Sequence, residues 1–398
     1  MRTLWIPVPV VPCVIFVLVL LAAGGVDAAK LQVATNGTDS ALCGTSAATP
    51  CRSISQAIAN AQVSDTIQVG PGRYGDANAD GDFDDPGDEA AEIDTGCDCL
   101  IHVPVGKPLT LLSRDGANVT LIDARGAAID VVRIDAPGTA FGKPKRGFTL
   151  TGSGSARGLF SSADDLVIGG NLALANGSHG IKLEGDRCDL NGNQALQNGD
   201  SGFFLDGAND GLIRGNVAIS NDNDGFSQVN RSLVKNNVSI ANDNDGFDQQ
   251  GNDLVYRGNA ALGNGGIGFD LNGGDRTVLT GILAQGNRNG VSVGGSDTVL
   301  AKSSIVGNLG VGIVVEGGGT QLVIGKSNIF GNNVVADPVV TNCGVTTLSV
   351  GPLNVAGDFW GAATGPGADP ADDLCPFVPQ IGLVVEPPAT KEIKVKAP

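Results

Sequence analysis

The stretch from Asn237 to Asn264 reads NVSIANDNDGFDQQGNDLVYRGNAALGN, and its pattern recurs along much of the chain. A glycine followed by an apolar, any and a second apolar residue occurs at Gly158. It recurs after 22, 22, 23, 21, 22, 22 and 22 residues, the last time at Gly312. Asparagine recurs with the same period, for example at Asn242 and Asn264. Self-similarity at a fixed period of this length indicates a solenoid, in which each coil covers the apolar face of its neighbour.

The content of each repeat indicates which kind of solenoid this is. Short alternations such as GIKLEG, GFFLDG and GVSVGG, separated by Asn, Gly and Asp, predict two or three short parallel strands per coil. Asparagine tolerates left-handed turns, and its amide can bond to the coils above and below. The residue two after each repeat glycine should face solvent from one sheet. This row is Lys182, Phe204, Ser227, Asp248, Asp270, Ser292 and Val314.

Composition excludes several classes of protein. The chain has 398 residues, with 42 acidic against 25 basic residues and a formal net charge of -17. Because nucleic-acid binding rests on basic residues that release counterions, nucleic acid is not an expected partner. A hydrophobic content of 41% is too high for a disordered acidic chain, and the 60 glycines follow no Gly-X-Y period. The chain should therefore bury a core.

The first 28 residues have the features of a secretory signal peptide. Arg2 precedes an apolar stretch from Leu4 to Ala23, and small residues precede a cleavage point after Ala28. A retained membrane anchor is the alternative, disfavoured by three prolines within the stretch. We expect an exported protein, secreted, periplasmic or at the cell surface. It should be a monomer with no membrane span after processing.

Seven cysteines remain after that cleavage, and an oxidising destination favours disulfides. Cys43 with Cys51 would staple the N-terminal segment, and Cys343 with Cys375 the C-terminal one. Cys97, Cys99 and Cys188 are then left with an odd thiol, although spacing alone does not fix the connectivity. A zinc site at the C-x-C pair is disfavoured, because no second Cys pair stands nearby in the sequence to complete four ligands.

The repeats resemble those of the right-handed parallel β-helix of the pectin-lyase-like superfamily. Two further segments carry the likeness, CGTSAATPCRSISQAIANAQVSDTIQVGPGRY at 43–74 and GDFWGAATGPGADPADDLCPF at 357–377. The resemblance implies an all-β solenoid with a capping helix at one end and an irregular cap at the other. The implied divisions are an N-terminal cap at 29–65, a β-helix at 66–333 with an acidic loop at 75–96, a C-terminal cap at 334–386 and a solvated tail at 387–398.

Two adjacent coils carry NDNDGFS and NDNDGFD, which gather carboxylates on one face. Clustered like charges need hydration or a bridging cation, and oxygen-only ligands suit Ca²⁺. The pattern also resembles the calcium site of family 9 pectate lyases. The resemblance implies Asp224, Asn244, Asp245 and Asp248 as ligands and places Asp270 where that family has its catalytic Lys. The alternative is that these aspartates occupy solvated turns.

A second acidic segment, DANADGDFDDPGDEAAE at 76–92, resembles a calcium loop. Asp76, Asn78, Asp80 and Gly81 fit positions 1, 3, 5 and 6 of an EF-hand-like loop, with Asp84 at position 9. Position 12 is a glycine, which Asp88 or Glu89 could replace. The alternative is a solvated acidic insertion between early coils.

The sequence thus favours an exported β-helix protein that binds or processes an acidic polysaccharide, with lyase-like chemistry on a polyuronate. Since protein and polymer are both acidic, Ca²⁺ or basic side chains would have to bridge them. Arg257, Arg276 and Arg288 are the basic residues closest in sequence to the acidic face. The competing class is a non-catalytic surface or structural module whose repeats are scaffold only.

Overall fold

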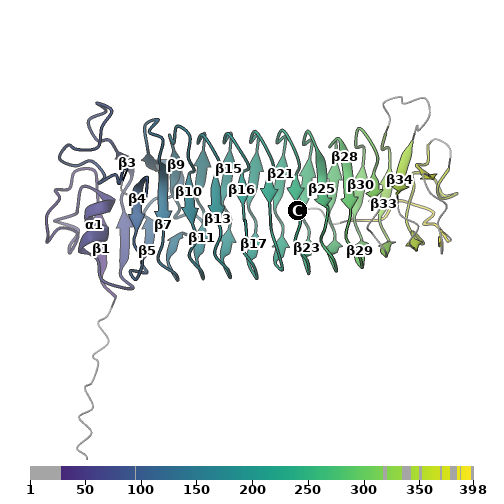
Figure 1. Cartoon of the computed structure of the whole chain (residues 1–398), viewed down its shortest axis with the longest axis horizontal. Coiled ribbons are helices and arrows are strands. Elements are labelled where there is room, and N and C mark those ends of the chain that lie inside the picture. Colours follow the sequence, from purple (N-terminus) through teal and green to yellow (C-terminus); the bar gives the residue numbers. More distant parts are fainter. Residues whose placement is uncertain are drawn as a thin grey trace, which may run out of the picture.

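The structure is a computed structural model that describes residues 28–94, 96–316, 321–333, 342–348, 352–367, 370–376, 383–385 and 387–395. The chain forms a right-handed parallel β-helix (Figure 1), and within the described residues its three sheets A, B and C have 13, 11 and 12 strands. Each coil passes through sheet A, then B, then C. The all-β solenoid predicted from the repeat is therefore confirmed. The segment interpreted as a signal peptide lies almost wholly outside the described residues.

Sheet A contains, in stacking order, β1 (Lys30–Val33), β2 (Thr66–Val69), β5 (Thr110–Ser113), β8 (Ala140–Gly142), β11 (Val167–Gly169), β14 (Asp189–Asn191), β17 (Leu212–Arg214), β20 (Leu233–Lys235), β23 (Val255–Arg257), β26 (Val278–Thr280), β29 (Thr298–Ala301), β32 (Leu322–Gly325) and β35 (Leu353–Asn354). Sheet B contains β3 (Gly72–Gly75), β6 (Thr120–Asp123), β9 (Thr149–Thr151), β12 (Leu172–Leu174), β15 (Gln194–Leu196), β18 (Val217–Ile219), β21 (Val238–Ile240), β24 (Ala260–Leu262), β27 (Leu283–Gln285), β30 (Ser304–Val306) and β33 (Asn328–Phe330). Sheet C contains β4 (Cys99–Val103), β7 (Asp130–Ile134), β10 (Leu159–Ser161), β13 (Ile181–Leu183), β16 (Phe203–Phe204), β19 (Phe226–Ser227), β22 (Phe247–Asp248), β25 (Ile267–Leu271), β28 (Asn289–Val293), β31 (Ile313–Val315), β34 (Cys343–Thr347) and β36 (Asp373–Pro376).

The helices of the described residues are α1 (Ile54–Asn60) and the short 3-10 helix η1 (Ala117–Val119). Within the described ranges, neither helix has the length and hydropathy that crossing a bilayer requires.

The core is a stack of like side chains, because parallel strands pair in register from coil to coil. Phe203, Phe226, Phe247 and Phe269 point inward from sheet C and stack with ring centroids 4.7, 4.8 and 4.7 Å apart. All four rings are fully buried. Aromatic burial of this kind gives each central coil a large share of its stability.

Buried asparagines occupy the corners between the sheets and form ladders along the stack. The Asn198 side chain accepts a hydrogen bond from Asn176 Nδ2 at 3.1 Å and donates one to Asn221 Oδ1 at 2.9 Å. This ladder runs on to Asn332, whose Nδ2 donates to the buried carboxylate of Asp372 at 2.8 Å. The amides thereby satisfy polar groups that the turns would otherwise leave buried without partners. The ladder asparagines are structural residues.

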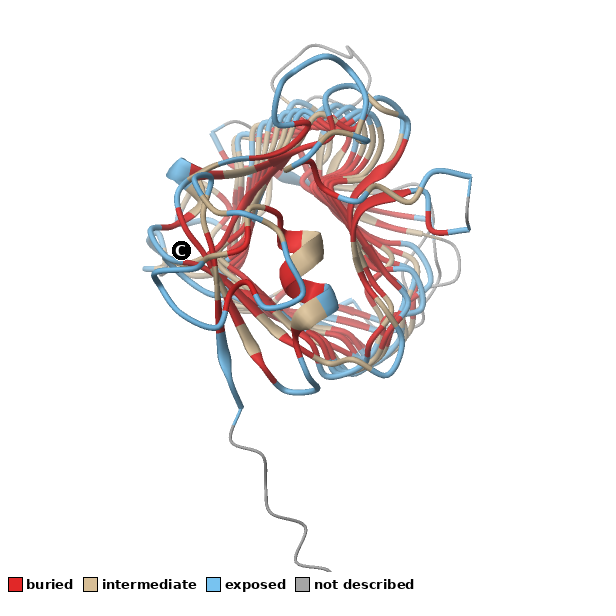
Figure 2. Ribbon diagram, turned by 90° about the vertical axis from the view of Figure 1, so that its left-hand side faces the viewer, coloured by how far each residue is buried: buried red, intermediate tan, exposed pale blue. Residues whose placement is uncertain are grey.

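The N-terminal end of the solenoid is closed by α1, which lies across the opening (Figure 2). The Ser53 hydroxyl caps this helix by accepting a hydrogen bond from Gln56 N at 3.1 Å. The side chains that α1 buries are Ile54, Ala57 and Ile58. Parallel pairing starts before residue 66, because β1 pairs with β2. The stack therefore reaches into the segment assigned to the cap from the sequence.

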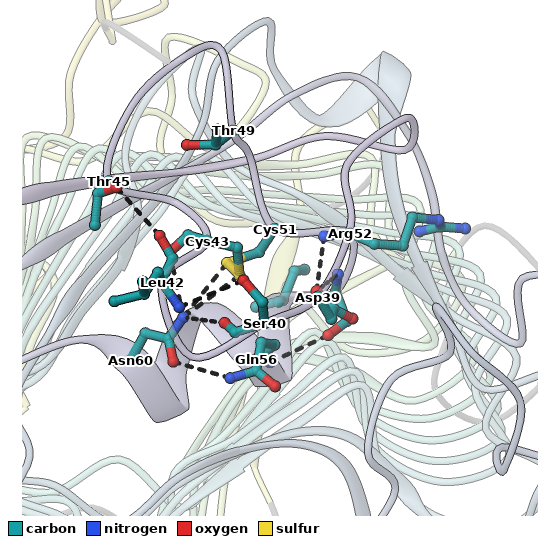
Figure 3. Close-up of a disulfide and its surroundings, with 12 residues drawn as sticks. Asp39, Ser40, Leu42, Cys43, Thr45, Thr49, Cys51, Arg52, Gln56 and Asn60 are labelled. Carbon is teal, nitrogen blue, oxygen red and sulfur yellow. Dashed lines mark hydrogen bonds between the residues drawn. A yellow bond between two sulfur atoms is a disulfide. The ribbon is translucent and has the colours of Figure 1, made fainter.

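A disulfide between Cys43 and Cys51 holds the loop that covers α1 (Figure 3). The side chain of Asn60, at the end of α1, donates to Ser40 O at 2.8 Å, and Asp39 Oδ1 accepts from Arg52 N at 2.7 Å. Covalent and polar contacts thus hold the cap together.

Two further disulfides join Cys97 to Cys99 and Cys343 to Cys375. Cys188 is a free, buried thiol, and burial raises its pKa to about 11. The odd thiol that the cysteine count requires is therefore inert in the interior.

At the C-terminal end the stack continues past residue 333, since β35 pairs with β32 and β36 with β34. Trp360 is fully buried there. The tail differs from the solvated end expected from its sequence. Asn328 in β33 exchanges two hydrogen bonds of 2.8 Å with the backbone of Ile393, and Ile393 and Val395 are half-buried. The tail is therefore packed against the outside of sheet B.

Candidate functional site

One continuous row of side chains runs along the outer face of sheet C. The strand register aligns His102, Arg133, Phe160, Lys182, Phe204, Ser227, Asp248, Asp270, Ser292 and Val314. Inward residues such as Phe247 and Phe269 alternate with this row and are buried. The row anticipated from the glycine period is thus present, and it begins further toward the N-terminus than Lys182.

Three carboxylates meet near the middle of this row. Asp248 in β22 and Asp270 in β25 are paired in the register, and Asp245 lies in the turn before β22. One ligand oxygen from each lies within 4.8 Å of the others. This proximity follows from the repeat, which places acidic residues at equivalent positions of consecutive coils.

Hydrogen bonds satisfy only part of this carboxylate group. Asp245 Oδ1 accepts from Ile267 N at 2.6 Å, and Asp270 Oδ2 accepts from Asn272 Nδ2 at 2.8 Å. Asp270 Oδ1 is buried and has no hydrogen-bond partner among the described residues. A buried, unpartnered carboxylate oxygen is costly, so this atom has capacity for a proton or a cation.

The electrostatics of the cluster follow from burial and like charge. Desolvation, with the nearby Asp245 carboxylate, raises the pKa of Asp270 to about 7. Desolvation likewise raises the pKa of Asp245 to about 6, and it raises the pKa of Asp248. Asp270 therefore titrates near neutral pH. Cation binding would favour the ionised form of all three.

The remaining ligands expected from the sequence lie beside this group. Asn244 Nδ2 donates to Asp224 Oδ1 at 2.8 Å, and the backbone N–H of Asp245 donates to the same oxygen at 3.1 Å. Asp224 is thus held by its neighbours, and Asn244 directs its amide hydrogens toward Asp224. The carboxylates that come together are those of Asp245, Asp248 and Asp270. Asp270, expected as a base, therefore belongs to the candidate ligand group.

A basic and aromatic group occupies the N-terminal half of the same row. The Arg157 guanidinium lies 4.2 Å from the Phe160 ring centroid, and that of Arg133 lies 5.0 Å from it. Lys182 Nζ lies 5.8 Å from the Phe160 ring and 5.1 Å from the Phe204 ring. Stacking on aromatic faces orients these cations at little entropic cost. The sequence signal was available, because Phe160 stands two residues after the first repeat glycine, Gly158.

The cations of this group are also paired with acids. Arg157 Nε contacts Asp130 at 2.7 Å, and Lys182 Nζ contacts Glu184 at 3.0 Å. These pairs fix the positions of the cations while leaving part of each side chain accessible to a ligand.

The three arginines predicted to contact the polysaccharide, because they are close in sequence to the acidic face, lie on different parts of the solenoid. Arg257 ends β23 and projects from sheet A, so it lies on another face of the solenoid. Arg276 lies in the turn between sheets C and A, where it contacts Asp253 at 2.6 Å. Arg288 is exposed just before β28, beside sheet C. Distance along a solenoid sequence does not measure distance across its faces, and only Arg288 borders the acidic row.

The acidic loop between β3 and β4 folds around its own backbone. Asp76 is buried, and its Oδ2 accepts from Gly81 N at 2.9 Å. Asn78 Nδ2 donates to Asp80 Oδ2 at 2.9 Å. The carboxylates that converge are those of Asp80 and Asp82, which are exposed, and Asp85, which is half-buried. Asp84, expected as the position-9 ligand, is outside that group.

Glu89, a candidate twelfth ligand, is used elsewhere. Its carboxylate accepts from Ile54 N at 2.8 Å and from Ser55 N at 2.7 Å, which caps the N-terminus of α1. Burial raises the pKa of this carboxyl to about 7. Glu89 therefore ties the acidic loop to the capping helix.

No family model matches the chain, and no curated protein does so either. Solved structures similar to it include the A-modules of two Azotobacter vinelandii mannuronan C-5 epimerases. For the AlgE4 module the TM-score is 0.59 at 16% identity, covering 81% of this chain and 91% of the module. For the AlgE6 module it is 0.53 at 18% identity, covering 83% and 92%.

A third similar structure is a mannuronic acid specific polysaccharide family 6 lyase from human gut microbiota. Its TM-score is 0.50 at 9% identity, covering 79% of this chain and 78% of the lyase. Because identities this low establish architecture only, the comparison concerns the fold. The chain therefore shares the parallel β-helix architecture of these structures.

Proposed function

We propose that the protein is exported and that the outer face of sheet C binds and processes a uronate-containing polysaccharide with the help of Ca²⁺. The observation that carries this proposal is the single outward row in which a basic and aromatic group is followed by a carboxylate cluster. The similar structures, two mannuronan C-5 epimerase modules and a lyase specific for mannuronic acid, support a polymer of this chemistry.

The two groups would engage different parts of one polymer. Lys182 and Asp270 are separated by four coil spacings, or about 19 Å. A polymer lying along the row would meet Arg157 and Lys182 with one carboxylate and the acidic cluster with another. The first contact is a charge-assisted pair, and the second requires a cation because both partners are anionic.

Asp245, Asp248 and Asp270 would hold the Ca²⁺. Their oxygens fit a hard cation, and the unpartnered Oδ1 of Asp270 supplies a ligand atom with no competing hydrogen bond among the described residues. Bound Ca²⁺ would neutralise a uronate carboxylate and make the adjacent C5 proton more acidic. The acidic loop at Asp76, Asn78, Asp80 and Asp84 would be a second, structural calcium site. Its converging carboxylates would place Asp82 and Asp85 in the ligand set.

The candidate chemistry is β-elimination. A base takes the C5 proton, the C5–H electron pair forms the C4–C5 double bond, and the C4–O bond breaks. The leaving oxygen then takes a proton from solvent. A pKa of about 7 lets Asp270 accept a proton near neutral pH. A cation held against Asp270 would lower that pKa, so during proton abstraction Asp245 and Asp248 would hold the Ca²⁺ while Asp270 acts as the base.

The experiment is an elimination assay on polymannuronate, polyguluronate and polygalacturonate, read as the ultraviolet absorbance of the unsaturated product. Activity should require Ca²⁺ and should fall at least roughly a hundredfold in Asp245→Asn, as for loss of a transition-state contact. Asp297→Asn is the matched control, because Asp297 is exposed and lies in the turn between sheets C and A.

A non-catalytic binding module is the second candidate. It is favoured by Asp270, which stands where family 9 pectate lyases have their catalytic Lys. Binding of these polymers without product formation would assign the protein to that class. Absence of both binding and Ca²⁺ uptake in calorimetry would refute the polysaccharide proposal and the calcium proposal together.

A further inference from the structure

The outer face of sheet B carries no charged side chain from β9 to β33. The strand register aligns one outward row of Thr149, Leu172, Gln194, Val217, Val238, Ala260, Leu283, Ser304 and Asn328. It aligns a second row of Thr151, Leu174, Leu196, Ile219, Ile240, Leu262, Gln285, Val306 and Phe330. The central side chains, from Val217 to Leu262, are aliphatic. In a protein with a net charge of -17, an uncharged face of this length with half-buried aliphatic side chains at its centre is a candidate interaction surface.

The chain itself shows what this face accepts. Its C-terminal tail reaches sheet B at Asn328, where Ile393 and Val395 are half-buried while Glu392 and Lys394 are exposed. An extended segment thus places its apolar side on the face and its charges in solvent. The central coils, around β18 and β21, offer the same kind of surface.

Charges of opposite sign border the two edges of this face. The last outward position of the sheet A strands gives a basic edge, with Arg214, Lys235 and Arg257 aligned by the register. On the opposite edge, in the turns between sheets B and C, Asp222 and Asp243 are exposed. Arg214 already contacts Asp189 of its own chain at 2.6 Å, whereas among the described residues no ion pair joins Lys235, Asp222 or Asp243 to another side chain.

We propose that this face is the interface with a second copy of the chain, and that the two solenoids lie side by side and point in the same direction. A two-fold axis parallel to the solenoid axis would bring the basic edge of each copy over the acidic edge of the other. Because Lys235 and Asp243 belong to one coil, Lys235 would meet Asp243 of the second copy, and Arg214 would meet its Asp222. An antiparallel pair would instead place basic edge against basic edge.

The dimensions of the face set the strength of this association. From β9 to β30, short of the end that the tail covers, the rows span seven coil spacings, about 34 Å, and a three-residue strand is about 10 Å long. The resulting area of about 340 Å² is smaller than the roughly 800 Å² that each partner contributes to a standard interface. The dimer should therefore be weak, concentration-dependent and sensitive to salt. This proposal departs from the expected monomer, and it is independent of the proposed polysaccharide function.

Sedimentation of the full chain over a concentration series tests the proposal. The wild-type protein should shift from monomer to dimer, and Ile219→Glu with Ile240→Glu should remain monomeric. Lys235→Asp and Asp243→Lys should each weaken the dimer at least roughly tenfold, because each places like charges together. The double variant Lys235→Asp with Asp243→Lys should restore it, since both pairs are then re-formed with reversed sign. Arg276→Asp is the control for charge reversal of an exposed cation, because Arg276 lies in the turn between sheets C and A, away from both edges of this face.

A monomer at every concentration would overturn the proposal. So would a dimer that survives the two glutamate substitutions. Failure of the double charge reversal to restore the dimer would overturn the parallel arrangement. Far-ultraviolet circular dichroism of each variant establishes that loss of the dimer is not loss of the fold.

Discussion

At the scale of single residues, Asp270 illustrates what the sequence could and could not reveal. Its position on the outward row followed from the glycine period alone, because parallel coils stay in register. Its environment did not follow, since burial, the partner Asn272 and the unpartnered Oδ1 depend on turns of varying length. The basic group at Arg157 and Phe160 was equally readable, but it lies at the first repeat glycine, N-terminal to the coils that carry the acidic motif.

The raised carboxyl pKa values predict a particular pH dependence of stability. Folding raises the pKa of Asp270 to about 7 and that of Asp245 to about 6, above the unfolded value of about 3.9. Their favourable contribution is therefore complete below about pH 4 and is lost as the pH rises through about 6 to 7. Without Ca²⁺, the melting temperature should fall by several degrees between about pH 5 and about pH 8.

Calcium and substitution provide the controls for that titration. Saturating Ca²⁺ should restore the melting temperature at about pH 8, because binding to the folded state stabilises it. Asp270→Asn should melt at a higher temperature than wild type there without Ca²⁺, and its stability should depend less on pH. A wild-type melting temperature that is constant across this range would contradict the assigned electrostatics.

At the scale of elements, two ladders of different kind run along the corners of the solenoid. The asparagine ladder is buried and is recognisable from sequence, because one residue type recurs with the coil period. A second ladder joins exposed charges of successive coils, with Arg187 to Asp165, Arg231 to Asp210 and Arg276 to Asp253 at 2.7, 3.1 and 2.6 Å. That ladder alternates in sign between coils. A search for identical residues does not detect this ladder, so from the sequence alone Arg276 is a candidate for binding the polysaccharide.

The two ladders should differ sharply in their contribution to stability. Asn221→Ala removes the acceptor of Asn198 and the donor to Ala195 O within the core. Unfolding by denaturant should show a loss of about 3 kcal/mol, because buried polar groups are left unpaired. Gln194→Ala, at an exposed position of β15, should leave the free energy of unfolding unchanged.

Arg231→Met tests the exposed ladder. The salt bridge that it removes lies in solvent, where pairing contributes little, so the midpoint of unfolding should match that of wild type. An Asn221→Ala loss no larger than that of Arg231→Met would contradict the assignment of the asparagines as the main polar support of the corners.

At the scale of the whole molecule, the solenoid is a one-dimensional stack closed at both ends. The architecture was predictable because each coil repeats the same local solution, and α1 was expected from the resemblance of residues 43–74 to the capping segment of such solenoids. The limits of the stack were less predictable. Strands β1, β35 and β36 pair with the ends through registers that the repeat does not encode. The tail also packs on sheet B through Asn328, a contact between distant segments.

A stack of nearly equivalent coils predicts tolerance of whole-coil deletion. Deleting residues 180–201 removes one whole coil. The coil of Phe203 then stacks on the coil of Arg157 in the same register, and each outward row stays continuous. The shortened protein should give a β-type circular dichroism spectrum and a cooperative transition. Removing residues 180–190 instead would exchange the sheets of all later coils, and that variant should not fold. If both shortened proteins fold, or if neither does, the whole coil is not the unit of stability.

The central claim is that the outer face of sheet C binds a polyuronate through both its basic and its acidic halves. Isothermal titration of the full chain with an oligouronate long enough to span the row, with and without Ca²⁺, tests it most directly. Binding should require Ca²⁺ and should weaken at least roughly tenfold in both Lys182→Met and Asp245→Asn, as expected for loss of a charged contact. Binding that is unchanged by removal of Ca²⁺ and by both substitutions would place the ligand elsewhere and contradict the account.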